Sequence, residues 1–198
     1  MPRFLAIRHA ESTMNAAGLW QGQADAPLSP RGREQAGALA EELRGRAIAA
    51  LVCSDLSRAR ETAEILAEVL GLVPRLEPDL REMDVGAWSA QPHAELLERY
   101  PEDVARVRAG DWDVRPGGGE CRREVRSRAV AALERAREGT GGGLLAVVTH
   151  MGVLRAVVPG ITLANAEARM LPWAALSELG SADDSSEPDG TAAAGGPL

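Results

Sequence analysis

Lysine is absent from this sequence, so all 22 residues of the lysine and arginine class are arginine. Its absence excludes catalysis through a lysine Schiff base or a lysine general base, and it excludes a P-loop, which requires a lysine. Any anion site must therefore be built from arginine, histidine and backbone N–H groups. Arginine suits phosphate because its planar guanidinium can bond two oxygen atoms at once.

Aromatic residues, cysteines and long apolar runs are also scarce. Aromatic residues make up 3% of the chain and hydrophobic residues 45%, which predicts a core of aliphatic side chains. No apolar run approaches the 18 residues of a membrane span, and no secretory signal precedes the first apolar run. Cys53 lies in an apolar run, and Cys121 opens a predicted helix. We therefore expect a cytoplasmic protein with reduced thiols and no membrane partner.

The charge balance gives no support to nucleic-acid binding. The formal net charge is −7, and four of the acidic residues lie in 181–198, a segment without any basic residue. The remainder of the chain is still acidic, at −3. We interpret the arginines of the segment 120–138 as a solvated helix face, because glutamates interrupt them. The chain length suits one domain, for which we predict residues 1–180, followed by a disordered acidic tail over 181–198.

Apolar runs alternate with segments of helical periodicity along the chain. This alternation predicts an α/β three-layer sandwich, with a mostly parallel central sheet and helices on both faces. Predicted strands cover 4–7, 48–53, 73–76, 144–149 and 173–179. Predicted helices cover 30–43, 59–70, 120–138 and 151–158. Two further short helices, split near Pro101, form a predicted insertion at 92–109 that lies over the ligand site and covers the substrate.

Polar residues follow three of the apolar runs at the point where each run ends. One run ends in Arg8 and His9, one just before Ser54 and Arg58, and one in Thr149 and His150; this places two histidines and two arginines at strand ends. The carboxyl ends of neighbouring parallel strands meet at one edge, where α/β proteins bind ligands. A histidine there can act as a base, a metal ligand or a nucleophile. Two arginines would repel a cation, and no close histidine pair exists, so we predict an anion cradle around a nucleophile and no metal.

Residues 8–12, Arg-His-Ala-Glu-Ser, followed by Asn15, resemble the signature of the histidine phosphatase superfamily, in the branch that includes cofactor-dependent phosphoglycerate mutase. Further blocks of this family follow in order at 21–25, 54–59, 80–82, 119–120 and 149–150. Each block alone is weak, but their order and spacing together are specific. The resemblance covers most of residues 3–160.

This resemblance implies a catalytic cycle without any metal or cofactor. It identifies His9 as the nucleophile that becomes a phosphohistidine. The groups that it implies for holding the phosphoryl oxygens are Arg8, Arg58 and His150, with Asn15, Gln21 and Gly22 as further donors. Glu82 is implied as the proton donor to the leaving oxygen and then as the group that helps water attack. Repulsion from a bound phosphate favours the protonated form of this carboxylic acid.

Departures from the family pattern favour a phosphatase over a mutase. Val85 stands where true mutases carry a substrate-gripping tyrosine, His93 stands where they carry a lysine, and their longer insertion is absent. Met151 and Cys121 also differ from the usual glycine and serine. We predict a phosphomonoesterase for a small phosphorylated metabolite, a sugar phosphate or a phosphoglycerate-like compound, with 92–109 setting specificity. A mutase and a catalytically inactive phosphate-binding protein remain as alternatives, and the sequence leaves monomer and homodimer open.

Overall fold

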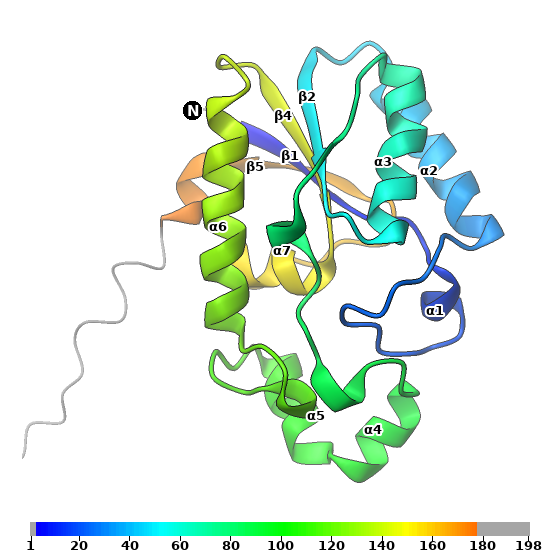
Figure 1. The fold of residues 1–198 in the computed structure, drawn as a ribbon, viewed down its shortest axis with the longest axis vertical. Helices are drawn as coiled ribbons and strands as arrows, with labels where there is room; N and C mark the ends of the chain where they lie inside the picture. Colours follow the sequence, from blue (N-terminus) through cyan, green and yellow to red (C-terminus); the bar gives the residue numbers. More distant parts are fainter. Residues whose placement is uncertain (1–2, 178–198) are drawn as a thin grey trace, which may run out of the picture.

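The computed structural model describes residues 3–177, in which five strands form one sheet (Figure 1). The strands lie in the order β3-β2-β4-β1-β5. Four of them are mutually parallel, and β5 pairs antiparallel with β1 at one edge. Their bounds are Arg3–Arg8 (β1), Ile48–Cys53 (β2), Arg75–Leu76 (β3), Leu144–Thr149 (β4) and Ala168–Pro172 (β5).

Helices cover both faces of this sheet, which confirms the predicted three-layer α/β architecture. Figure 1 shows α2 and α3 on one side of the sheet and α6 on the other. The long helices are α2 (Pro30–Leu43), α3 (Ser57–Leu70) and α6 (Arg122–Glu138), and the shorter ones are α1 (Thr13–Ala16), α4 (His93–Arg99), α5 (Pro101–Ala109) and α7 (Met151–Val157). Four 3₁₀ turns are η1 (Pro78–Leu80), η2 (Gly86–Trp88), η3 (Pro116–Gly118) and η4 (Trp173–Leu176).

Local sequence signals explain where the two helices on one face begin and end. The Ser29 side chain accepts a 2.9 Å hydrogen bond from the Gly32 N–H, and Pro30 occupies the first position of α2. Both features are favoured at helix starts. At the C-terminal end of the neighbouring helix α3, Gly71 adopts the left-handed conformation with φ of 66°, which terminates the helix.

The two faces of the sheet form two separate aliphatic cores. Alternate residues of β1 point to opposite faces, so Phe4 and Ala6 pack with α6 and α7, whereas Leu5 and Ile7 pack with α2 and α3. Cys53 lies fully buried in the second core. Burial raises the pKa of its thiol to about 12, so this cysteine is an unreactive core residue.

The predicted last strand over 173–179 is wrong. Residues 173–176 form the 3₁₀ turn η4, and the strand is β5, which precedes them. Trp173 and Leu176 are both buried, and their spacing of three suits a helical turn rather than a strand. The Trp173 ring packs against Phe4 of β1, with 4.7 Å between ring centroids. β5 escaped prediction because it is an edge strand that includes exposed Arg169 and ends in proline.

The interpretation of the α6 arginines as a solvated face holds only in part. Arg123 and Arg135 form exposed ion pairs with acidic residues. Arg126, in contrast, donates to the carbonyls of Ala156, Val157 and Leu176 at 2.6–3.1 Å. Its guanidinium therefore ties α6 to α7 and η4. Charge pattern alone did not distinguish the two kinds of arginine, because both alternate with glutamate.

Two predictions concern features at the limits of the described chain. Within residues 3–177, no helix is both long enough and apolar enough to cross a membrane. The acidic tail predicted over 181–198 lies outside the described residues.

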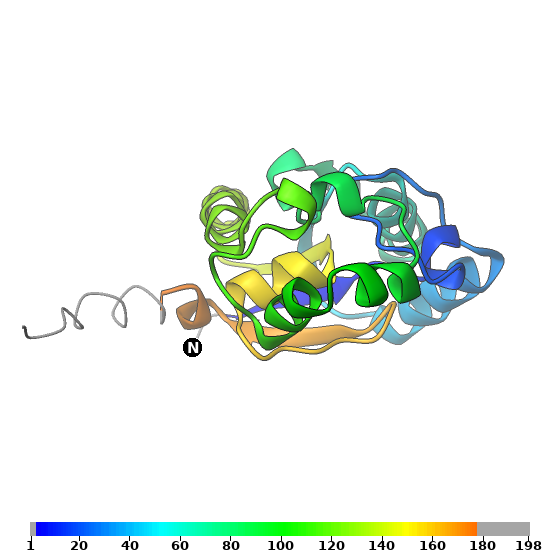
Figure 2. The same cartoon turned by 90° about the horizontal axis from the view of Figure 1, so that it is seen from below.

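Figure 2 views the molecule from below and shows α4 and α5 in front of the sheet, at the end where the parallel strands finish. The insertion predicted over 92–109 thus consists of two helices divided at Tyr100 and Pro101.

Candidate active site

The two histidines predicted to converge lie side by side at the ends of β1 and β4. These strands are neighbours in register, with Arg8 opposite Thr149, and the His9 N–H donates to the Thr149 carbonyl at 2.9 Å. The rings of His9 and His150 are 5.0 Å apart between centroids. Both residues are buried, at 3% and 0% exposure. The strand pairing itself therefore brings the histidines together.

One hydrogen bond and the surrounding charges determine the state of His9. Its Nδ1 lies 2.7 Å from the Ala10 carbonyl oxygen, which can only accept, so Nδ1 carries the hydrogen and Nε2 carries the lone pair. Burial lowers the pKa of His9 well below its ordinary value of 6.5, and the charges of Arg58 and Arg8 lower it further. His9 is consequently neutral at pH 7, and its Nε2 is available as a nucleophile.

Arg58 enters the site from the first turn of α3 and is fully buried. Its two terminal nitrogens donate to the carbonyls of Ala24 and Gly22, at 2.9 and 2.8 Å. The same loop is fixed to the start of α3 by Asp25, whose carboxylate accepts from the N–H and hydroxyl of Ser57, both at 2.7 Å. The loop thus holds the guanidinium of Arg58 in one orientation beside His9.

Unsatisfied buried nitrogens are concentrated at this site. Among the described residues, the buried side-chain polar atoms without a hydrogen-bond partner are Arg8 Nε, Arg58 Nε and both ring nitrogens of His150. Burial lowers the pKa of His150 well below 6.5, and Arg58 and His9 lower it further. A buried donor without a partner costs about 1–3 kcal/mol, and native proteins rarely retain one. Several at one point indicate a site built to bind an oxyanion.

Asn15, Gln21 and Gly22 lie on the wall of the same pocket. Oδ1 of Asn15 accepts hydrogen bonds from the N–H of Ser12 at 3.1 Å and from Nδ2 of Asn165 at 3.4 Å. These bonds orient the Asn15 amide and leave its Nδ2 as the group that can donate into the pocket. Asn165 also donates to the His9 carbonyl, at 3.1 Å. Sequence reasoning missed Asn165, because no motif or strand end marks it.

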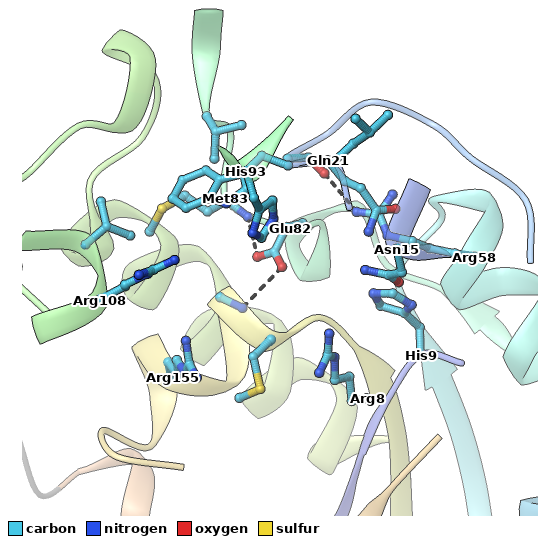
Figure 3. A pocket seen from close by; sticks show the side chains of 17 residues that line it. Arg8, His9, Asn15, Gln21, Arg58, Glu82, Met83, His93, Arg108 and Arg155 are labelled. Atoms are coloured by element: carbon cyan, nitrogen blue, oxygen red, sulfur yellow. Dashed lines mark hydrogen bonds between the residues drawn. The ribbon is translucent and has the colours of Figure 1, made fainter. Parts of the chain in front are cut away.

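Glu82 faces the pocket from the segment between η1 and η2 (Figure 3). Its Oε1 accepts from the Met83 N–H at 2.8 Å, and its Oε2 accepts from the Gly152 N–H at 3.2 Å. The second bond ties the carboxylate to the first turn of α7, directly after His150. The structure therefore places the predicted acid in one pocket with Arg8, His9 and Arg58.

Arg128 supports the backbone on which Glu82 sits. From α6, its guanidinium donates to the carbonyls of Asp79, Arg81 and Glu82 at 2.7–3.1 Å. Two further bonds of 2.8 Å join it to the Glu120 carboxylate. Arg128 therefore fixes a segment that has little regular structure of its own. The interpretation of this arginine as part of a solvated face is wrong, because only 18% of its side chain is exposed.

The insertion contributes residues to the pocket that no strand end predicted. His93 comes from α4, and Val107 and Arg108 come from α5. Trp20 lies in the loop that carries Gln21 and Gly22, and it packs against the insertion. Its ring lies 5.6 Å from that of His93 in α4 and 5.0 Å from that of Trp88 in η2. Figure 3 shows Arg108 and Arg155 on one side of Glu82, and His9 and Arg58 on the other.

The residues predicted to act together thus share one pocket or its immediate wall. Arg8, His9, Asn15, Gln21, Gly22, Arg58 and Glu82 line the pocket, and His150 lies buried against His9. Over residues 3–177, no group of three or more histidine, cysteine, aspartate or glutamate side chains is arranged to hold a metal ion. The prediction of metal-independent chemistry stays a prediction.

Comparisons with known proteins agree with this architecture. The sequence pattern of the histidine phosphatase superfamily (branch 1) matches residues 4–189. A metal-independent phosphoserine phosphatase of Arabidopsis thaliana is 38% identical over 168 residues, covering 83% of this chain and 71% of that protein. A Photorhabdus laumondii protein named "Probable phosphoglycerate mutase GpmB" is 37% identical over 176 residues, covering 83% and 77%.

A solved structure also resembles the fold closely. The mycobacterial glucosyl-3-phosphoglycerate phosphatase, in a complex with VO3, superimposes with a TM-score of 0.79 at 30% sequence identity. The match covers 87% of this chain and 93% of that one.

Proposed function

Because the chain belongs to the histidine phosphatase superfamily (branch 1), we propose that it hydrolyses a small phosphorylated metabolite through a phosphohistidine on His9. It is a phosphoric monoester hydrolase, in keeping with relatives and structural neighbours that are named phosphatases. The observation that carries the proposed mechanism is the state of His9. This neutral imidazole has its Nδ1 committed to the Ala10 carbonyl and lies beside Arg8, Arg58 and His150.

In the first proposed step, the lone pair on Nε2 of His9 attacks the phosphorus atom. The bond between phosphorus and the ester oxygen breaks, and that oxygen takes a proton from Glu82. Arg8, Arg58 and His150 hold the remaining phosphoryl oxygens, whose charge must be stabilised during transfer. Asn15, Gln21 and Gly22 support the same oxygens from the opposite loop. Arg8 Nε, Arg58 Nε and the one ring nitrogen of His150 that carries a hydrogen have no protein partner and would donate these hydrogen bonds.

In the second proposed step, water replaces the leaving alcohol. Ionised Glu82 takes a proton from this water as its oxygen attacks the phosphorus atom. The bond between phosphorus and Nε2 breaks, inorganic phosphate leaves, and His9 returns to its neutral form. The arginines supply the positive charge throughout, so the cycle requires neither a metal nor an organic cofactor.

The pocket favours a phosphatase over a mutase. Val85 and His93 both line it, where mutases are expected to carry a tyrosine and a lysine that grip the substrate. A mutase must hold its substrate for phosphoryl return to a second hydroxyl, whereas a phosphatase needs only water. A mutase remains a second candidate, because a relative carries that name. Phosphoglycerate isomerisation after priming with 2,3-bisphosphoglycerate would support it.

Hydrolysis of p-nitrophenyl phosphate in the presence of a chelator tests the proposed function. We expect chelator-resistant activity in the native protein and a loss of about a thousandfold or more in His9→Ala. Rapid quenching should trap one phosphoryl group on the native protein in an acid-labile, alkali-stable bond, and none on the variant. A requirement for metal, or full activity of His9→Ala, would refute the mechanism. Stable phosphate binding without turnover on any substrate would instead support an inactive binding protein.

A further inference from the structure

Two arginines line the pocket but have no part in the proposed mechanism. Arg108 extends from the last turn of α5, and Arg155 extends from α7. Both lie on the side of Glu82 away from His9 (Figure 3). Arg155 is half-buried and makes one long bond, of 3.4 Å, from its Nε to the Ile161 carbonyl. A leaving group bound at Glu82 would extend from the phosphate site toward these two arginines.

Within the part of the chain that the structure describes, no acidic residue forms a salt bridge with Arg108 or Arg155, and Glu82 is the one acidic residue that lines the pocket. Other arginines on the same elements behave differently. Arg106, two residues before Arg108 on α5, pairs with Asp111 at 2.8 Å. In a chain with 29 acidic and 22 basic residues, such a local excess of positive charge needs an explanation.

The electrostatic effects of these arginines on their neighbours also indicate an excess of positive charge in the pocket. Burial lowers the pKa of Arg8, and the positive charge of Arg155 lowers it further, with Glu82 opposing both. Burial likewise lowers the pKa of His93, and the charge of Arg108 adds to this shift. The pocket thus holds like charges that repel one another. An anion placed between them would remove this repulsion.

The charges of the pocket can be counted against the proposed substrate. Its lining contains Arg8, Arg58, Arg108 and Arg155 as cations and Glu82 as the single acid. With Glu82 protonated, as the proposed first step requires, a phosphate monoester dianion balances two of the four positive charges, and two remain. A carboxylate supplies one further negative charge, and its two oxygens match the planar fork of a guanidinium.

We propose that Arg108 and Arg155 form a second anion subsite, which binds a carboxylate on the leaving group of the substrate. This inference rests on the proposed function, because it assumes that the phosphoryl group lies at His9 and the leaving oxygen at Glu82. The substrate class is then a phosphorylated hydroxy acid rather than a neutral sugar phosphate. The two arginines would act in specificity and not in the chemical step.

The test compares phosphate release from two substrates that differ at one group. 3-Phosphoglycerate carries a carboxylate where glycerol 3-phosphate carries a hydroxymethyl group. We expect the native protein to favour 3-phosphoglycerate in kcat/KM by about tenfold to a hundredfold, as charge-assisted hydrogen bonds provide. Arg108→Gln and Arg155→Gln should each reduce this preference by about tenfold, mainly through KM, because the carboxylate is bound equally before and during reaction.

Matched variants separate this role from a structural one. Arg106→Gln removes a neighbouring arginine that pairs with Asp111 outside the pocket. This variant should keep the native preference for 3-phosphoglycerate over glycerol 3-phosphate. Arg155→Lys keeps the charge but loses the planar fork, so it should retain more of the preference than Arg155→Gln, even if the bond to the Ile161 carbonyl is lost. A preference that persists in both Arg108→Gln and Arg155→Gln would refute the proposed subsite.

The native protein alone separates this proposal from the proposed function. If it hydrolyses p-nitrophenyl phosphate but shows no preference for 3-phosphoglycerate, the subsite is refuted and the proposed function stands. A native protein that hydrolyses none of these compounds refutes the proposed function itself.

Discussion

The N–H of Gly152 donates a 3.2 Å hydrogen bond to Oε2 of Glu82, although the two residues belong to different parts of the fold. Gly152 lies in the first turn of α7, next to the strand end that carries His150. A Cβ atom added at position 152 would approach Oε1 of Glu82 more closely than real atoms can. The glycine therefore leaves room for the carboxylate, and the bond fixes it in the pocket.

Gly152→Ala should reduce activity without unfolding the protein. The added methyl displaces the end of a flexible side chain, so the free energy of unfolding should change by no more than about 1 kcal/mol, the difference in helix propensity between glycine and alanine. Because the proposed proton donation by Glu82 would be impaired, kcat/KM should decrease by about tenfold to a hundredfold. The loss should be larger for an alkyl phosphate than for p-nitrophenyl phosphate, whose leaving group needs less protonation.

Gly37→Ala is the matched control for this prediction. Gly37 also lies within a helix, α2, and a Cβ there meets no atom within 4 Å. Its alanine variant should keep full activity on both substrates and gain up to about 1 kcal/mol of stability. Equal activities of the two alanine variants would mean that the Glu82 carboxylate is not held where the mechanism needs it.

Arg128→Gln should weaken both stability and catalysis, because Arg128 is a positioning residue for the segment that carries Glu82. The substitution leaves the carbonyls of Asp79 and Arg81 without their donor and Glu120 without its cation. The Glu82 carbonyl keeps only its 3.2 Å bond from Gln23. We expect a loss of about 2 kcal/mol in the free energy of unfolding, from the unsatisfied groups. At a temperature where the variant is folded, kcat on an alkyl phosphate should fall about tenfold, and kcat on p-nitrophenyl phosphate should fall less.

Arg135→Gln, on the same helix, provides the comparison. Arg135 pairs with Glu77 and Asp79, but 49% of its side chain is exposed. Exposed ion pairs contribute less than about 1 kcal/mol, so this variant should be nearly as stable as the native protein and fully active. Urea denaturation and steady-state kinetics measure both effects. If kcat of Arg128→Gln fell equally on the two substrates, a role in positioning Glu82 would be contradicted.

The free energy of unfolding should decrease when the pH is lowered from about 7.5 to about 5.5. The pKa values of His9 and His150 lie well below 6.5 in the folded protein and return to about 6.5 on unfolding. The unfolded chain therefore binds more protons in this window, and stability is complete above about pH 6.5 and falls below it. Each histidine should contribute about 1.4 kcal/mol to this decrease.

His150→Gln isolates one of these contributions. Its free energy of unfolding should fall by about 1.4 kcal/mol less than that of the native protein over the same pH range. His93→Gln should change the pH dependence less, because His93 is exposed at the pocket and its pKa is lowered less strongly. Urea denaturation at the two pH values makes the comparison, and identical pH dependence in all three proteins would show that the buried histidines bind protons as readily as exposed ones.

The sequence was sufficient to predict the elements that carry His9, Arg58 and His150. β1, β2 and β4 are continuous apolar runs, which is the pattern of strands buried on both faces. Each run ends in polar residues, and parallel pairing brings those ends together. For this reason the sequence alone predicts that His9, Arg58 and His150 lie near one another. Their proposed roles came from the resemblance to the family and not from the pattern.

The arginines on helices could not be assigned in the same way. Arg106 and Arg108 lie two residues apart on α5, yet one pairs with Asp111 and the other lines the pocket. Arg128 and Arg135 likewise share α6, and only the first reaches the backbone beneath Glu82. The partners of a long side chain depend on how helices pack on distant segments, which periodicity does not encode. The edge strand β5 escaped prediction for a related reason, since half of its pattern faces solvent.

The position of β4 in the sheet has a consequence for how activity arises during synthesis. β4 comes fourth along the chain but lies at the centre of the sheet, between β2 and β1. The two strands made first therefore have no direct contact in the finished fold, and they are joined only when residues 144–149 insert between them. The same insertion delivers His150 to His9. Closure of the sheet and assembly of the histidine pair are thus one event, and a nascent chain that ends before β4 has neither.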